Sequence, residues 1–264
     1  MEFRILGPLV VLGDDGSGIQ VVQPRQRALL SVLLIGANEP QSVDSLMDAI
    51  WGERPPQAAS GSLRTYVWAL RRLLGPVPRL HTTHGGYLID AGPDELDAVV
   101  FERLFSEART LVARGEPAMA SGRLGHALEL WRNPPFADLP QVTSTAGRVE
   151  LLRSLKYAAQ ELLISVDISL GRYQQVVPGL RELLAQEPTR ELCWAQLMIA
   201  LYHSGRRAEA LAAYGRAHQA LIDEFGIEPG IRLRKLHHQM LSEDPALDEP
   251  DNGPLQFDLM SGLG

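Results

Sequence analysis

The hydrophobic and polar positions of the first 92 residues alternate between strand-like and helix-like periods. Two runs of β-forming residues, "FRILGPLVVL" and "IQVV", lie on either side of a turn rich in glycine and aspartate. The next run, "PRQRALLSVLLIGAN", places leucines at helical spacing after Pro24, which the first turn of a helix tolerates. A second helix is predicted from Ser42, a favourable N-cap, to Gly52. This order predicts short strands followed by short helices in one small domain.

A third helix is predicted after Pro55 and Pro56, with its apolar and polar residues on opposite faces. The apolar positions form one continuous stripe that should be buried: Leu63, Val67, Leu70 and Leu74. The opposite face collects small, polar and basic residues: Gly61, Arg64, Thr65, Trp68 and Arg72, with Ala69 and Arg71 beside them. Tryptophan is seldom left fully exposed, so the alternative for Trp68 is packing under a neighbouring loop.

A β-hairpin is predicted directly after this helix. Beyond Pro76 and Pro78, the sequence "RLHTTHGGYLID" has alternating strand character on both sides of a glycine turn. A hairpin after a helix-turn-helix forms a wing, which can contact the DNA backbone or minor groove. His81 and His84 alone are a poor metal site because no cysteine or carboxylate accompanies them. We therefore predict a wing and no metal centre.

From Leu96 to Leu241 the chain is rich in leucine and alanine, has helical periodicity and shows no convincing strand. Gly171 and Gly205 lie 34 residues apart, each between two amphipathic segments, which is the tetratricopeptide period. An earlier pair of segments has the same helix-glycine-helix order at a different spacing. Such pairs stack into a solenoid that can bind protein segments. The alternative is that these helices only support the first domain.

Composition adds limits on compartment and domain count. The 264 residues, 45% of them hydrophobic, suffice for two domains with cores of their own. The single cysteine, Cys193, cannot form an internal disulfide, which fits a reducing cytoplasm. The first residues do not resemble a signal peptide, and no run is long enough to span a bilayer. We expect a soluble cytoplasmic protein without membrane contact.

The last 22 residues, 243–264, are acidic, interrupted by proline and glycine, and contain no basic residue. We expect a disordered acidic tail. Within it, "PLQFDLM" is either a binding motif or an inert segment.

Charge is distributed unevenly in this chain of formal net charge -7. Between Trp51 and Asp90 there are five arginines and only two acidic residues. A local basic patch is what nucleic-acid contact needs, because phosphates are neutralised locally. The alternative is an ordinary solvated surface. On the third helix, arginine can pair with guanine O6 and N7, and a threonine methyl can meet the thymine methyl.

No enzyme motif is present. The chain has no G-x-x-x-x-G-K-S/T phosphate loop, no G-x-S-x-G elbow and no H-E-x-x-H helix. Cys193 lies in an apolar helical run, which indicates a core residue and not a nucleophile. We therefore predict neither an enzyme nor a cofactor.

The chain resembles the Streptomyces antibiotic regulatory protein family along nearly its whole length. The matching segments are "FRILGPL", "PRQRALLSVLL", "LMDAIWGERPP", "LRTYVWALRRLLG" and "GGYLI", followed by "ALELWRNPPFADL", "LGRY" and "FGIEPGIRLRKLHHQML". The resemblance implies a mixed fold. Residues 1–92 are an α+β winged helix-turn-helix of the OmpR type, and residues 93–242 are an all-α, tetratricopeptide-like bacterial transcriptional activation domain.

The predicted DNA-contacting residues are Arg64, Thr65, Trp68, Arg71, Arg72, Arg79, Thr83, His84 and Gly85. Of these, Arg79 is predicted to contact a phosphate. The resemblance implies a transcriptional activator of an antibiotic or other secondary-metabolite gene cluster, located in the cytoplasm at the nucleoid. It also implies a head-to-tail pair of protomers on direct repeats in double-stranded promoter DNA. That pair is expected to recruit RNA polymerase through contacts that include the sigma subunit.

Two other functions remain open. One is a helical-repeat adaptor whose winged helix mediates protein contacts. The other is a ligand-gated regulator, although the sequence shows no polar cluster that favours it.

Overall fold

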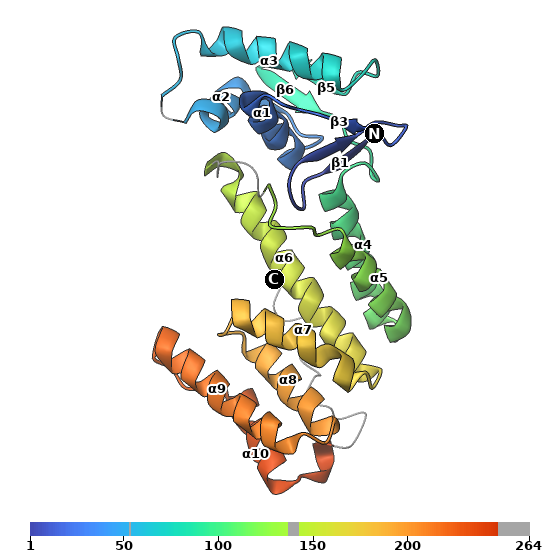
Figure 1. Cartoon of the computed structure of the whole chain (residues 1–264), viewed down its shortest axis with the longest axis vertical. Helices are drawn as coiled ribbons and strands as arrows, with labels where there is room; N and C mark the ends of the chain where they lie inside the picture. Colours follow the sequence, from blue (N-terminus) through green and yellow to red (C-terminus); the bar gives the residue numbers. More distant parts are fainter. Residues whose placement is uncertain (53, 137–142, 248–264) are drawn as a thin grey trace. The chain divides into compact units, whose positions relative to one another are not determined.

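A computed structural model of the chain describes residues 1–52, 54–136 and 143–247 (Figure 1). The chain forms two units. The N-terminal unit consists of Met1–Glu107 and Arg123–Ala159, and the C-terminal unit of Ala108–Gly122 and Gln160–Gly264.

The N-terminal unit begins with a three-stranded antiparallel sheet in the order β1-β2-β3. Its strands are β1 (Glu2–Arg4), β2 (Val10–Leu12) and β3 (Gly18–Ile19). The run "FRILGPLVVL" thus forms two strands and not one. The strand is interrupted because the amides of Ile5 and Leu6 donate to the Asp97 carboxylate, at 2.8 and 3.0 Å, and Pro8 has no amide to donate.

Three helices follow: α1 (Pro24–Ile35), α2 (Val43–Trp51) and α3 (Ala59–Leu73). The predicted start of α1 and both predicted ends of α2 are confirmed. Pro24 opens α1, and the Ser42 hydroxyl accepts a hydrogen bond from the Ser45 amide, at 3.1 Å, to cap α2. Gly52 ends α2 with a positive φ of 63°. Helix α1 contacts both α2 and α3 through buried leucines and forms the centre of this domain.

The predicted wing is the hairpin of β5 (Leu80–Thr83) and β6 (Gly86–Ile89), with Thr82 opposite Tyr87. A third strand, β4 (Gln41–Ser42), pairs with the other edge of β6 and was not predicted from the sequence. Gly86 permits this pairing, because a Cβ there would lie 1.9 Å from the backbone carbonyl oxygen of Gln41. The preceding Gly85 has a φ of 88°, which side chains other than glycine rarely adopt.

The rest of the described chain is helical. Its helices are α4 (Asp97–Ala113), α5 (Pro117–Glu129), α6 (Thr143–Ser169), α7 (Tyr173–Gln186), α8 (Glu191–His203), α9 (Arg207–Phe225) and α10 (Ile231–Ser242). Helices α4, α5 and α6 contribute residues to both units. The predicted all-helical region from residue 96 to 241 is confirmed in its described parts.

The predicted helix-glycine-helix repeat is also confirmed. Gly171 and Gly205 adopt left-handed φ values of 73° and 74° between paired helices, and Gly115 does the same at 74°. After each glycine, the next amide donates to a carbonyl five residues back, as Arg172 does to Asp167 at 2.9 Å. This is the Schellman helix end, which favours glycine.

Helix α8 forms the centre of the C-terminal unit. It is buried from Cys193 to Leu201 and contacts α7, α9 and α10. A continuous buried surface explains why its sequence is apolar on every side. Consequently α8 does not present these side chains to an open binding groove.

The first residues after α10 are described as far as Leu247. A short 3-10 turn, Pro245–Leu247, follows α10, and the Leu247 side chain is buried. Of the expected disordered tail, residues 243–247 are therefore described, and its "PLQFDLM" segment lies outside the described residues. No helix in the described part of the chain combines the length and apolarity needed to cross a membrane.

Candidate DNA interface

Helix α3 is held in the N-terminal unit by its apolar stripe. Leu63, Val67, Leu70 and Leu74 are all buried, as predicted, and α3 contacts α1, α2 and β5. Burial of these four side chains fixes the helix rotation, because residues three and four apart share one face. The opposite face is therefore presented to solvent.

The outward face of α3 is basic. The helix contains three arginines and no acidic residue. The side chain of Arg64 is exposed and makes no hydrogen bond or ion pair within the described residues. Beside it, the Thr65 hydroxyl donates to the Gly61 carbonyl at 3.1 Å. Arg64 thus has all its donors available, and Thr65 keeps its methyl group and an acceptor oxygen.

Trp68 lies on this outward face and does not pack under a loop. Its side chain is 58% exposed, and the Arg72 guanidinium carbon lies 4.8 Å from the centre of the indole ring. An exposed cation-π contact of this kind contributes about 0.5–1 kcal/mol. The pair presents a flat apolar surface and a positive charge together, one helical turn from Arg64.

Arg71 is directed to the wing. Its Nε donates to the Leu80 carbonyl at 2.8 Å, and its Nη2 donates to the Thr82 hydroxyl at 2.9 Å. Two of its donors are therefore used to fix β5 against α3. The structure thus shows Arg71 positioning the wing, and its predicted contact with DNA stays a prediction.

At the tip of the wing, His84 and Gly85 are exposed, as a DNA contact requires. The Val43 amide donates to the Gly85 carbonyl at 3.0 Å, which holds the turn against the start of α2. Thr83 differs from prediction, because its hydroxyl is buried and has no hydrogen-bond partner among the described residues. That hydroxyl is not available to a phosphate.

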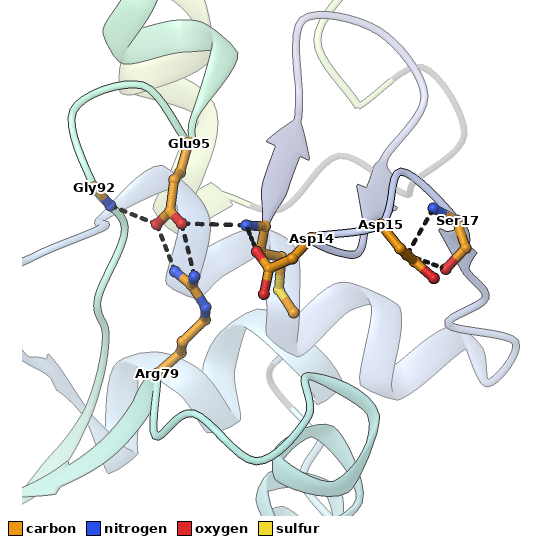
Figure 2. A network of polar contacts seen from close by, with 7 residues as sticks. Asp14, Asp15, Ser17, Arg79, Gly92 and Glu95 are labelled. Atoms are coloured by element: carbon orange, nitrogen blue, oxygen red, sulfur yellow. Dashed lines mark hydrogen bonds and ion pairs between the residues drawn. The ribbon is translucent and has the colours of Figure 1, made fainter.

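Arg79 is the clearest departure from the predicted site. Its guanidinium donates to both oxygens of Glu95, at 2.5 and 2.6 Å, and the same carboxylate accepts from the Gly92 amide at 2.8 Å (Figure 2). The Arg79 side chain is only 13% exposed. The structure therefore places Arg79 in an ion pair within the N-terminal unit, with little of its side chain exposed for the predicted phosphate contact.

The pKa of Glu95 reports how tightly this pair is held. Hydrogen bonding from Arg79 is the largest cause that lowers the pKa of Glu95, to about 2, and the bond from Gly92 adds to it. The pKa of Arg79 is raised for the same reason. No sequence signal indicated this pair, because its members are 16 residues apart and lie outside regular periodic segments.

An aromatic brace that positions α3 was also missed from the sequence. The rings of Trp51, at the end of α2, and Tyr66, on α3, stack at 6.1 Å between centroids. The Arg25 guanidinium carbon lies 6.0 Å from the centre of the Trp51 ring. In the sequence, this contact was indicated only by the position of Tyr66 next to the buried stripe of α3.

Among the described residues, no cluster of three or more histidines, cysteines or carboxylates could hold a metal ion.

Comparison with known proteins matches both parts of the chain. Residues 20–89 match the family described as transcriptional regulatory protein, C terminal, and residues 96–241 match the bacterial transcriptional activator domain. The chain is 36% identical to the regulatory protein DnrI of Streptomyces peucetius over 264 residues, covering 96% of each chain. It is 33% identical to the transcriptional regulator RedD of Streptomyces coelicolor, covering 95% of this chain and 73% of RedD.

A solved structure confirms the fold class. The structure of Mycobacterium tuberculosis EmbR in complex with a low affinity phosphopeptide superimposes with a TM-score of 0.87 at 35% identity. The match covers 92% of this chain and 65% of the EmbR chain. The predicted order, a winged helix followed by a helical activator domain, is thereby confirmed.

Proposed function

The chain belongs to the Streptomyces antibiotic regulatory protein family, and we propose that it activates transcription of a secondary-metabolite gene cluster. That it is a transcriptional regulator with a DNA-binding domain follows from its relatives and its two matched domains. Its similarity to DnrI and RedD over most of their lengths supports the narrower proposal.

The observation that carries the proposal is the acid-free outward face of α3. Arg64 has no competing partner within the described residues and can take guanine O6 and N7 with two donors. Thr65 offers a methyl group to thymine, and the Trp68–Arg72 pair offers apolar contact beside a phosphate-seeking charge. These residues would lie in the major groove as a recognition helix.

The wing contributes to docking and not to base recognition. His84 and Gly85 are exposed at its tip and would contact the sugar-phosphate backbone. Arg71 sets the angle between wing and helix through its bonds to β5. Arg79 and Thr83 are left out of the proposed interface.

Assembly and activation are proposed from family membership. Two protomers bind direct repeats head to tail. Because the protomers contact each other, binding of one to its repeat raises the effective concentration of the other at the adjacent repeat. The bound pair then recruits RNA polymerase through contacts that include the sigma subunit. The matched activator domain, residues 96–241, supports this assignment of the helical part.

Footprinting on the promoters that neighbour its gene tests the proposal. We expect protection of two direct repeats spaced by about one helical turn of DNA or a multiple of it. Binding to random DNA should fall steeply with salt, because phosphate contacts release counterions. Binding without protection of any repeat, or retention on DNA that is indifferent to salt, would favour the adaptor function.

A further inference from the structure

The charges at the end of the chain are segregated between α10 and the residues after it. Helix α10, "IRLRKLHHQMLS", contains three arginine or lysine residues and no acidic residue. Residues 243–264 contain six acidic residues and no basic one, in a chain whose formal net charge is -7. Nearly all of the net negative charge therefore follows directly after a basic helix.

One face of α10 is left without a partner in the described structure. Leu233, Leu236 and Met240 bury the inner face. The outer face consists of Ile231, Arg234, Lys235, His238 and Leu241, all of them exposed. We call this set the α10 outer face. Its two aliphatic side chains, Ile231 and Leu241, are 75% and 50% exposed, and its basic residues lie between them in the sequence.

The charges on this face are not neutralised locally. Arg234 and Lys235 make no side-chain hydrogen bond or ion pair within residues 1–52, 54–136 and 143–247. Ile231 and Leu241 are ten residues apart, which is about 15 Å along a helix. The face thus offers aliphatic side chains at each end and positive charge between, which suits an acidic segment with apolar residues.

The described chain ends at Leu247, six residues after Leu241, the last residue of this face. Arg207 donates to the carbonyls of Met240 and Leu241, at 3.1 and 2.9 Å, and holds the end of α10. The buried Leu247 then fixes the point from which the remaining chain departs. Leu255 is eight residues further on, a reach of about 26–29 Å when extended, so the segment can return along the whole face.

We propose that the segment of residues 251–260, "DNGPLQFDLM", docks on the α10 outer face of its own chain. Leu255, Phe257 and Leu259 cover the aliphatic ends, and Asp251 and Asp258 supply the charge opposite Arg234 and Lys235. A tether of this length gives an effective concentration of about 1 mM, so an intermolecular Kd of about 0.1 mM would keep roughly ten chains closed for each open one. A polymerase or protomer contact with this face would have to displace the segment.

A spin label on the full-length chain tests the proposal. Ser261→Cys provides the attachment point, because Cys193 is fully buried and burial raises the pKa of its thiol. We expect the methyl signals of Ile231 and Leu241 to lose most of their intensity, while that of the exposed Met119 is retained as reference. Replacing Phe257 and Leu259 by serine should restore the lost signals at unchanged charge.

Charge reversal provides the matched comparison. Arg234→Glu with Lys235→Glu should restore the Ile231 signal, and so should 1 M salt, because exposed ion pairs are screened. Arg109→Glu with Arg114→Glu makes the same change of charge at exposed arginines on and just after α4 and should leave the signal loss intact.

Three results would overturn the proposal. The first is full intensity at Ile231 and Leu241 in the labelled chain. The second is a signal loss transferred between labelled and unlabelled chains, which would make a second copy the occupant. The third is a charge-reversal variant at Arg234 and Lys235 that binds scrambled duplex DNA more weakly but keeps the loss of methyl signal. That result would make this face a phosphate contact. The methyl readout does not depend on operator binding, so its failure is distinguishable from failure of the proposed function.

Discussion

Replacing Glu95 by glutamine should destabilise the N-terminal unit, because it removes the charge that holds Arg79. In the intact protein, the Glu95 carboxylate accepts two bonds from Arg79, one from the Gly92 amide and one, at 3.3 Å, from the N-terminal ammonium group of Met1 (Figure 2). Glutamine has the same shape, but it is neutral and places an amide group against the guanidinium. The Arg79 side chain, 13% exposed, is then left enclosed without its counter-charge.

The size of the effect follows from the pKa of Glu95. Its lowering from the usual 4.5 to about 2 corresponds to about 3 kcal/mol favouring the ionised form in the folded state. The side chain is 24% exposed, so solvent screening reduces the contribution, and we expect a loss of about 2 kcal/mol in the free energy of unfolding at pH 7.

Urea unfolding followed by circular dichroism at several pH values measures this directly. A carboxyl group with a lowered folded pKa stabilises the protein above its unfolded pKa of 4.5, and that contribution is lost as pH falls toward 2. The difference between the parent and Glu95→Gln should therefore shrink steadily between pH 5 and pH 2.5. Burial raises the pKa of the nearby Asp97, but this carboxyl group is present in both proteins and should nearly cancel in the difference.

Asp15→Asn is the matched control. Within the described residues, its exposed carboxylate accepts bonds from the Ser17 amide and hydroxyl alone, in the loop drawn in the same view (Figure 2), so the free energy of unfolding should hardly change. Equal stability of the parent and Glu95→Gln at pH 7, or a difference that does not vary with pH, would refute the assigned role of the Arg79–Glu95 pair.

Three further changes test the fold. Gly86→Ala should unfold the wing, because the added Cβ would lie 1.9 Å from the backbone carbonyl oxygen of Gln41. Gly122→Ala is the control: its Cβ would have no atom within 4 Å, and the melting temperature should stay equal or rise. Leu70→Ala should cost about 2–5 kcal/mol in urea unfolding, because it opens a cavity at a fully buried position, and an unchanged midpoint would contradict that packing. A fragment of residues 1–159 should unfold cooperatively. A fragment of residues 1–92 should melt at a much lower temperature in the same circular dichroism experiment, because it lacks Asp97, whose carboxylate accepts hydrogen bonds from two buried amides. Equal melting temperatures of the two fragments would support the predicted domain boundary at residue 92.

The parts of this fold that could be predicted from the sequence are those determined by the spacing of residues close together in the chain. The stripe from Leu63 to Leu74 predicted which face of α3 is buried, and the exposed face followed from it. Gly171 and Gly205 predicted two helix ends because a left-handed residue is required at each. In these cases the signal and the structure involve the same few consecutive residues.

The parts that could not be predicted depend on partners distant in the sequence. Whether Arg79 faces DNA or an acid is decided by Glu95, which only the folded chain brings to it. Strand β4 has two polar residues, too few for a period, and exists because Gly86 allows close approach. The same limit applied to Arg71, whose charge was visible but whose hydrogen bonds to β5 were not.

Titration of Arg64→Ala on operator and scrambled DNA tests whether the outward face of α3 reads bases. Arg109→Ala removes one exposed arginine on α4 and serves as the control. We predict that Arg64→Ala costs about 1–3 kcal/mol on the operator and relaxes preference at one or two base positions, with a much smaller loss on scrambled DNA. Binding of both DNAs by Arg64→Ala as tightly as by the parent protein would contradict the account.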